Sequence, residues 1–160
     1  MAYRALEAAV GYDKMPEEVR RRLVRSCRQQ TWYVLGWDKL CAEQERFLAS
    51  LPAGEHTAPD LLELLRTYAL LAQREWAYVT KAEEFAESIA NRFDQQAAAD
   101  AIEKLADIYG QRGLTDRAAA LHRRVIEDWP ESAGARRAEV LISPPSTSPS
   151  EGSASSRAGT

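Results

Sequence analysis

Apolar residues recur at intervals of three and four positions along this chain as far as about residue 142. This period places them on one side of an α-helix, whereas a β-strand would show a period of two. Alternating runs of β-branched residues are almost lacking. The pattern therefore predicts an all-α protein with five or more helices.

Local signals mark where several of these helices begin. A start is favoured by Pro16-Glu17-Glu18, because proline suits the first helical turn and carboxylates face the positive end of the helix dipole. A capping box is predicted from Thr57-x-x-Asp60, and a further start from Thr115-Asp116. We expect a short first helix over residues 2–12.

The composition changes abruptly after Ile142. Residues 143–160 are rich in serine and proline and contain no large apolar side chain. Such a segment cannot offset the entropy cost of ordering by burying apolar surface. We therefore expect one helical domain over residues 1–142 and a disordered tail over residues 143–160.

The segment from Ile102 to Pro130 carries a more specific pattern. Its first predicted helix contains Ile102-x2-Leu105-Ala106-x2-Tyr109, its second contains Ala118-x3-His122, and Pro130 follows. This pattern resembles the tetratricopeptide repeat, a helix-turn-helix unit of roughly 34 residues. Such a unit cannot bury its apolar face alone, so the resemblance implies stacked neighbours in a right-handed α-α superhelix. It implies a protein-binding surface and points away from catalysis.

The same template can be placed twice more upstream, which predicts about three helical hairpins at residues 21–54, 62–96 and 99–132. In the first unit Gly36-Trp37-Asp38-Lys39 would form the turn between helices, and Arg28, Thr31 and Gln44 depart from the family pattern. The middle unit has Asp94 where the family usually has proline. A capping helix over residues 132–142 would close the last repeat with Ala138, Val140 and Leu141.

One set of helix positions lines the inner, concave groove in this family. Transferred to this chain, the set implies a groove that is basic and aromatic at one end and acidic at the other. A groove of this kind favours a peptide with opposite charges in the matching order. The implied residues are Arg22, Arg25, Gln29, Trp32 and Tyr33 in the first unit, Glu63, Arg66, Leu70, Gln73 and Arg74 in the middle unit, and Asp100, Glu103, Asp107, Gly110 and Gln111 in the last.

The best-known ligand site of the family, a carboxylate clamp for chaperone tails, is poorly matched. Arg25 and Gln29 are only loose substitutes for the clamp residues, and Asp100 replaces a required cation. Lys104 alone matches well. A co-chaperone function is therefore disfavoured.

Charge and composition narrow the classes of partner. The chain has 160 residues, 45% of them hydrophobic, and a net charge of -3, so no global positive field favours DNA or an anionic membrane. Locally, Arg21, Arg25 and Arg28 form one helical stripe, followed by Trp32 and Tyr33. This stripe fits a solvated helix face, a contact with an acidic peptide, or, less well, RNA.

Candidate chemistry is sparse. Cys27 and Cys41 form no metal-binding pair, and the two histidines, His56 in a predicted loop and His122 in a helix, are far apart in sequence. No nucleophile motif or phosphate loop is found. We expect no enzyme activity, no cofactor and no metal. The lack of a signal peptide or a long apolar run leads us to expect a cytoplasmic protein.

The functional expectation is thus a non-catalytic scaffold or adaptor that binds a peptide or partner protein through a concave helical groove. Two alternatives stay open. One is a module for homo-oligomerisation, and the other is an RNA-binding helical repeat.

Overall fold

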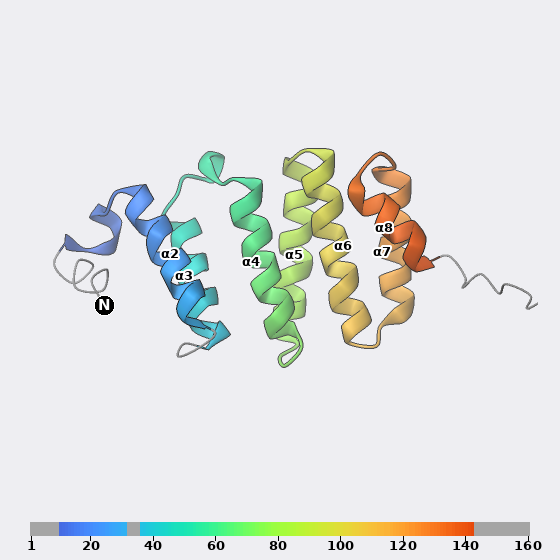
Figure 1. Ribbon diagram of the computed structural model, residues 1–160, viewed down its shortest axis with the longest axis horizontal. Helices are drawn as coiled ribbons and strands as arrows, with labels where there is room; N and C mark the ends of the chain where they lie inside the picture. Colours follow the sequence, from blue (N-terminus) through green and yellow to red (C-terminus); the bar gives the residue numbers. More distant parts are fainter. Residues whose placement is uncertain (1–9, 32–35, 143–160) are drawn as a thin grey trace, which may run out of the picture.

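The computed structural model describes residues 10–31 and 36–142. This part of the chain contains seven α-helices, two short 3-10 helices (η) and no strand, which confirms the predicted all-α class. The helices stand side by side in chain order along the long axis of the molecule (Figure 1). Their bounds are η1 Tyr12–Lys14, α2 Glu17–Thr31, α3 Trp37–Ala49, η2 Ala53–Glu55, α4 Ala58–Ala72, α5 Ala77–Arg92, α6 Gln95–Gln111, α7 Thr115–Asp128 and α8 Ala133–Ile142.

Helix starts agree with most of the capping signals. The Thr57 hydroxyl accepts a hydrogen bond from the Asp60 backbone N–H at 3.4 Å, so α4 begins at the predicted capping box. Helix α7 begins at Thr115, as predicted. Ser132 caps α8, because its Oγ accepts from the Ala135 N–H at 3.0 Å.

Asp94, the residue that departs from the family pattern, caps α6. Its carboxylate accepts a hydrogen bond from the Ala97 N–H at 2.9 Å. A carboxylate at this position also faces the positive end of the helix dipole, which stabilises the start of α6. At the other end of α6, Gly113 has φ 76°, a left-handed conformation that glycine adopts at little cost.

Two predicted helix boundaries differ from the structure or lie at the edge of its described part. The predicted turn at residues 36–39 is wrong, because α3 already begins at Trp37 and only Gly36 precedes it as the N-cap. The predicted helix over residues 2–12 lies mostly outside the described residues. Near its predicted end, Gly11 has a left-handed backbone conformation with φ 84°. The predicted tail, residues 143–160, also lies outside the described part.

The apolar core runs from α3 to α8 as one continuous cluster. Helix α2 joins it differently: Leu23 and Cys27 pack on Leu40 of α3 in a small separate cluster. Helix α2 packs closely on α3 but is not among the helices that pack closely on α4. An opening is therefore left between α2 and α4.

Farther along, each helix packs on the next, and α4 also packs on α6, as α6 does on α8. The helices α4, α6 and α8 thus share one side of the molecule, with α5 and α7 behind them (Figure 1). Polar contacts tie the helices together as well. Glu45 of α3 accepts hydrogen bonds from the Tyr68 hydroxyl and from Lys81 Nζ, both at 2.8 Å.

Helix α8 packs on its neighbours through small residues. A Cβ atom on Gly134 would come within 3.2 Å of the Ala99 Cβ, and Ala138 is fully buried, as predicted. The prediction for Val140 and Leu141 is wrong, since they are 75% and 61% exposed. Val140 stands two positions from Ala138, about 200° around the helix, and so faces away from the core; Leu141 lies in the last turn of α8.

Candidate functional site

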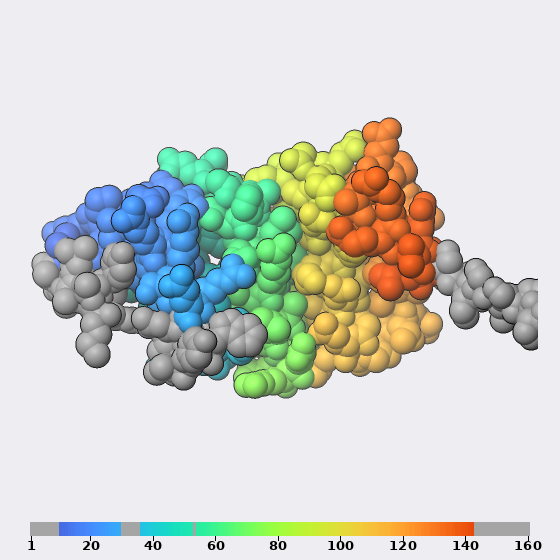
Figure 2. All heavy atoms as spheres, in the orientation of Figure 1, coloured from blue at the N-terminus to red at the C-terminus, as the bar shows by residue number. Residues whose placement is uncertain are grey.

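The side of the molecule formed by α2, α4, α6 and α8 carries three adjoining hollows, which we call the inner groove. Figure 2 shows this side in the orientation of Figure 1. The volumes of the hollows are about 220 Å³ between α2 and α4, 310 Å³ in the middle, and 460 Å³ between α4, α6 and α8. The first two share Arg28 and Glu63, and the last two share Arg66 and Lys104. The hollows therefore form one continuous surface across the molecule.

Two ion pairs bridge the opening between α2 and α4. Nη1 of Arg21 donates to both carboxylate oxygens of Asp60, at 2.7 and 2.6 Å, and Arg28 pairs with Glu63. The hydrogen bond to Asp60 is the main cause that raises the pKa of Arg21 above its ordinary value. The Arg21 guanidinium also lies 5.0 Å from the centre of the Phe47 ring. These contacts join α2 to α4 where close helix packing is missing.

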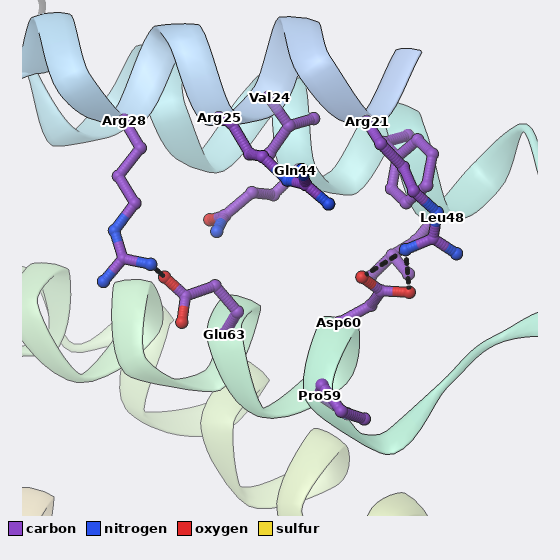
Figure 3. A pocket seen from close by; sticks show the side chains of 10 residues that line it. Arg21, Val24, Arg25, Arg28, Gln44, Leu48, Pro59, Asp60 and Glu63 are labelled. Atoms are coloured by element: carbon purple, nitrogen blue, oxygen red, sulfur yellow. Dashed lines mark hydrogen bonds and ion pairs between the residues drawn. The ribbon is translucent and has the colours of Figure 1, made fainter. Parts of the chain in front are cut away.

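Between the two ion pairs lies the α2–α4 cavity, and Arg25 and Gln44 point into it (Figure 3). Among the described residues Arg25 has no ion-pair partner, unlike Arg21 and Arg28 on the same helix. Gln44 is only 4% exposed, and its Oε1 has no hydrogen-bond partner within the described structure. The remaining walls are apolar and include Val24 and Leu48. Within the described part of the chain, the cavity thus combines an arginine without an ion-pair partner, a buried amide and apolar walls.

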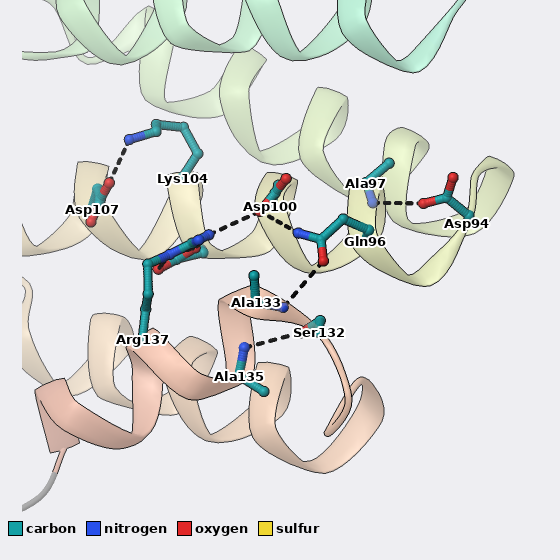
Figure 4. A network of polar contacts seen from close by, with 11 residues as sticks. Asp94, Gln96, Ala97, Asp100, Lys104, Asp107, Ser132, Ala133, Ala135 and Arg137 are labelled. Carbon is teal, nitrogen blue, oxygen red and sulfur yellow. Dashed lines mark hydrogen bonds and ion pairs between the residues drawn. The ribbon is translucent and has the colours of Figure 1, made fainter.

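At the other end of the inner groove, α8 contributes an arginine that the sequence did not single out (Figure 4). Nε of Arg137 donates to both oxygens of Glu103, at 2.8 and 3.0 Å, and its Nη2 donates to Asp100 at 2.9 Å. The hydrogen bond to Glu103 is the largest cause that raises the pKa of Arg137. Next to this cluster, Lys104 Nζ lies 2.5 Å from an Asp107 oxygen. The carboxylates of α6 are therefore offset by neighbouring cations.

Most of the residues that the resemblance placed in a groove do line the hollows. They are Arg25, Glu63, Arg66, Leu70, Gln73, Asp100, Glu103, Asp107 and Gln111.

The remaining predicted residues lie apart from the hollows or outside the described chain. Arg22 is exposed and pairs with Glu18 at 3.2 Å, and Gln29 is exposed without lining a hollow. Trp32 and Tyr33 lie outside the described residues. The predicted aromatic end of the groove therefore stays a prediction.

Three residues that matter in the inner groove were not predicted. Gln44 gave a signal, since it is polar at the position where the repeat pattern usually has an aromatic residue. Asp60 was predicted only as part of the capping box. Its backbone N–H donates to the Thr57 hydroxyl, which caps α4, and its carboxylate accepts from Arg21. Arg137 gave no signal, because its partners are more than thirty positions away on another helix.

The described side chains offer few groups for chemistry. Within residues 10–31 and 36–142, no three His, Cys, Asp or Glu side chains gather as a metal ion would require. His56 Nε2 lies 2.9 Å from the Leu48 carbonyl oxygen, and His122 is buried, with its Nδ1 unpartnered among these residues. Burial is the largest cause that raises the pKa of the Cys41 thiol to about 12.

Comparisons with protein-family models, with curated proteins and with solved structures gave no match. The resemblance to the tetratricopeptide repeat thus stays a prediction. Within the described part of the chain, no helix combines the length and the apolar character needed to cross a membrane.

Proposed function

We propose that this protein is a non-catalytic scaffold that binds a peptide segment of a partner protein along the inner groove. The observation that carries the proposal is the continuity of the three hollows, which share lining residues from α2 across α4 and α6 to α8. An extended or helical peptide needs such a long, polar-edged surface, and a small substrate does not.

In the same proposal, the helices form a right-handed, tetratricopeptide-like superhelix. The hairpins would be α2 with α3, α4 with α5, and α6 with α7, and α8 would be the capping helix. The close packing of each of these pairs, and of α8 on both α6 and α7, supports this assignment. In a superhelix of this type the first helices of the hairpins line the concave side, which agrees with the position of the hollows.

The net effect of charge on binding should be modest. Arg21, Arg28 and Arg137 already pair with carboxylates of neighbouring helices, so the groove lacks the strong separation of charge expected from the sequence. These pairs also reduce the positive charge that the α2 stripe offers to RNA. Peptide binding would rely on shape and on the few unpaired groups, with electrostatics acting mainly on orientation and association rate.

The test is to select peptides from a random display library on the intact chain and to measure their affinities by fluorescence anisotropy. Charge reversal at Arg66 in the inner groove (Arg66→Glu) should weaken the selected peptides at least fivefold. Arg123→Glu is the matched control, because Arg123 is exposed on α7, outside the three hollows. If no peptide is selected, or if both variants bind equally well, the proposal is wrong.

A second candidate function, self-association, is favoured by the apolar end of α8. Val140, Leu141 and Ile142 are 75%, 61% and 38% exposed in adjacent positions, and adjacent apolar side chains on a surface are typical of contact sites. Light scattering over a micromolar concentration series tests this candidate. Dimers that dissociate on Leu141→Glu would support it, and a monomer at every concentration would exclude it.

A further inference from the structure

The α2–α4 cavity differs from the rest of the inner groove in having an ion pair between α2 and α4 at each end. The Arg21–Asp60 pair stands at one end and the Arg28–Glu63 pair at the other (Figure 3). Helix α3 forms the floor with Gln44, Phe47 and Leu48. A space of about 220 Å³ bounded in this way admits a single side chain from the groove and not a length of backbone.

The floor of this cavity contains a buried polar atom that lacks a hydrogen-bond partner among the described residues. This atom is Oε1 of Gln44. The Gln44 side chain is only 4% exposed, and its amide end points into the cavity. A buried polar atom without a partner raises the free energy of the unbound protein. A ligand that donates a hydrogen bond to this atom therefore gains more binding free energy than it would from a hydrogen bond on the surface.

The rim and walls restrict the ligand further. Arg25 projects over the opening without an ion-pair partner among the described residues, while Val24, Leu48 and Pro59 supply apolar walls. A lysine side chain would enter among arginines and is disfavoured by like charge. A purely aliphatic side chain would fill the walls but leave Oε1 of Gln44 unpaired. An aromatic ring with an O–H or N–H at its far edge satisfies both.

We propose that the α2–α4 cavity is an anchor pocket for a tyrosine side chain flanked by acidic residues in the bound peptide. The ring packs on the apolar walls, the phenolic O–H donates to Oε1 of Gln44, and Arg25 pairs with a flanking carboxylate at the rim. Buried aromatic anchors with a polar edge are the side chains on which protein interfaces most depend. This inference rests on the proposed peptide-binding function and names its main contact.

The test uses two capped, fluorescein-labelled peptides, Glu-Asp-Tyr-Glu-Asp and its phenylalanine analogue, with the intact chain. The tyrosine peptide should bind about tenfold more tightly, because only its hydroxyl reaches the buried amide oxygen. In Gln44→Leu this preference should disappear, since the acceptor is gone while the apolar contact remains. Arg25→Gln should weaken both peptides by up to about fivefold, and the control Arg22→Gln on the same helix should leave them unchanged.

A second variant makes the test independent of how well Gln44→Leu folds. Val24→Trp fills the cavity from its wall and should abolish binding of the tyrosine peptide. Melting curves confirm that each variant is folded.

The outcomes separate this inference from the function on which it rests. The inference is overturned if the two peptides bind wild-type protein equally, if the preference survives in Gln44→Leu, or if neither peptide binds. The proposed function still stands in all three cases when library-selected peptides bind and remain sensitive to Arg66→Glu. When no peptide of any kind binds, both proposals fall.

Discussion

Replacing Arg137 should loosen the capping helix α8 from α6. The guanidinium donates to both oxygens of Glu103 and to Asp100, and the Glu103 side chain is only 12% exposed. Arg137→Met keeps most of the aliphatic stem but leaves the Glu103 carboxylate without its cation. The perturbation therefore removes charge and hydrogen bonds with little change in volume.

The expected loss follows from the burial of the two partners. A buried carboxylate deprived of its partners costs about 1–3 kcal/mol or more. The Arg137 side chain is 53% exposed, so water replaces part of the lost interaction and the lower half of that range applies. We expect Arg137→Met to reduce the free energy of unfolding by about 1–2 kcal/mol, which corresponds to a melting temperature lowered by about 3–8 °C.

Thermal and urea denaturation measure this change, and hydrogen exchange of the α8 amides locates it. Arg136→Met is the matched control, because Arg136 is exposed beside Arg137 and should change stability by no more than about 0.5 kcal/mol. In a double-mutant cycle, Glu103→Gln should make Arg137→Met less costly, since no buried charge remains to be paired. Equal effects of Arg137→Met and Arg136→Met, or strictly additive effects in the cycle, would refute the reasoning.

Three further predictions concern the rest of the fold. Burial raises the pKa of Glu45, but the hydrogen bonds from Lys81 and Tyr68 outweigh burial and lower this pKa below 4.5. The stability that these hydrogen bonds contribute should be present above pH 4.5 and lost as the pH falls below that value. Glu45→Gln should flatten this pH dependence in acid denaturation curves. Asp94→Ala should reduce the free energy of unfolding by about 1 kcal/mol by removing the α6 cap, whereas Asp94→Asn should retain most of it; equal losses would contradict a capping role. Cys41, with a pKa of about 12, should react with iodoacetamide at pH 8 far more slowly in the native protein than in urea, and comparable rates would show that the thiol is accessible.

The helical class could be predicted from the sequence because the signals that mark a helix are local. The period of three and four residues and caps such as Thr57 depend only on neighbours in the chain, and both are found in the structure. The error at Trp37 has the same origin. The family pattern placed a turn over residues 36–39, but a single N-cap, Gly36, is enough to begin α3.

The candidate site was predicted less completely because its key contacts are not local. Positions on one helix face could be transferred from the repeat pattern, and Arg25 and Glu63 do line the groove. The partner of each charge could not be read from spacing along the chain. Arg137 reaches Asp100 across 37 positions, and Arg21 reaches Asp60 across 39.

These long-range pairs also change how the charges of the inner groove should be understood. Taken from the sequence, the arginines of α2 and the carboxylates of α6 are opposite poles that attract a dipolar peptide. In the folded chain Arg21, Arg28, Asp100 and Glu103 pair with an adjacent helix, so their charges hold helices together and are less available to a ligand. In the α2–α4 cavity, Arg25 has no ion-pair partner and Oε1 of Gln44 has no hydrogen-bond partner among the described residues. Because an interface gains most from groups that are unpaired before binding and paired afterwards, specificity should depend on these two residues more than on the total charge of the groove.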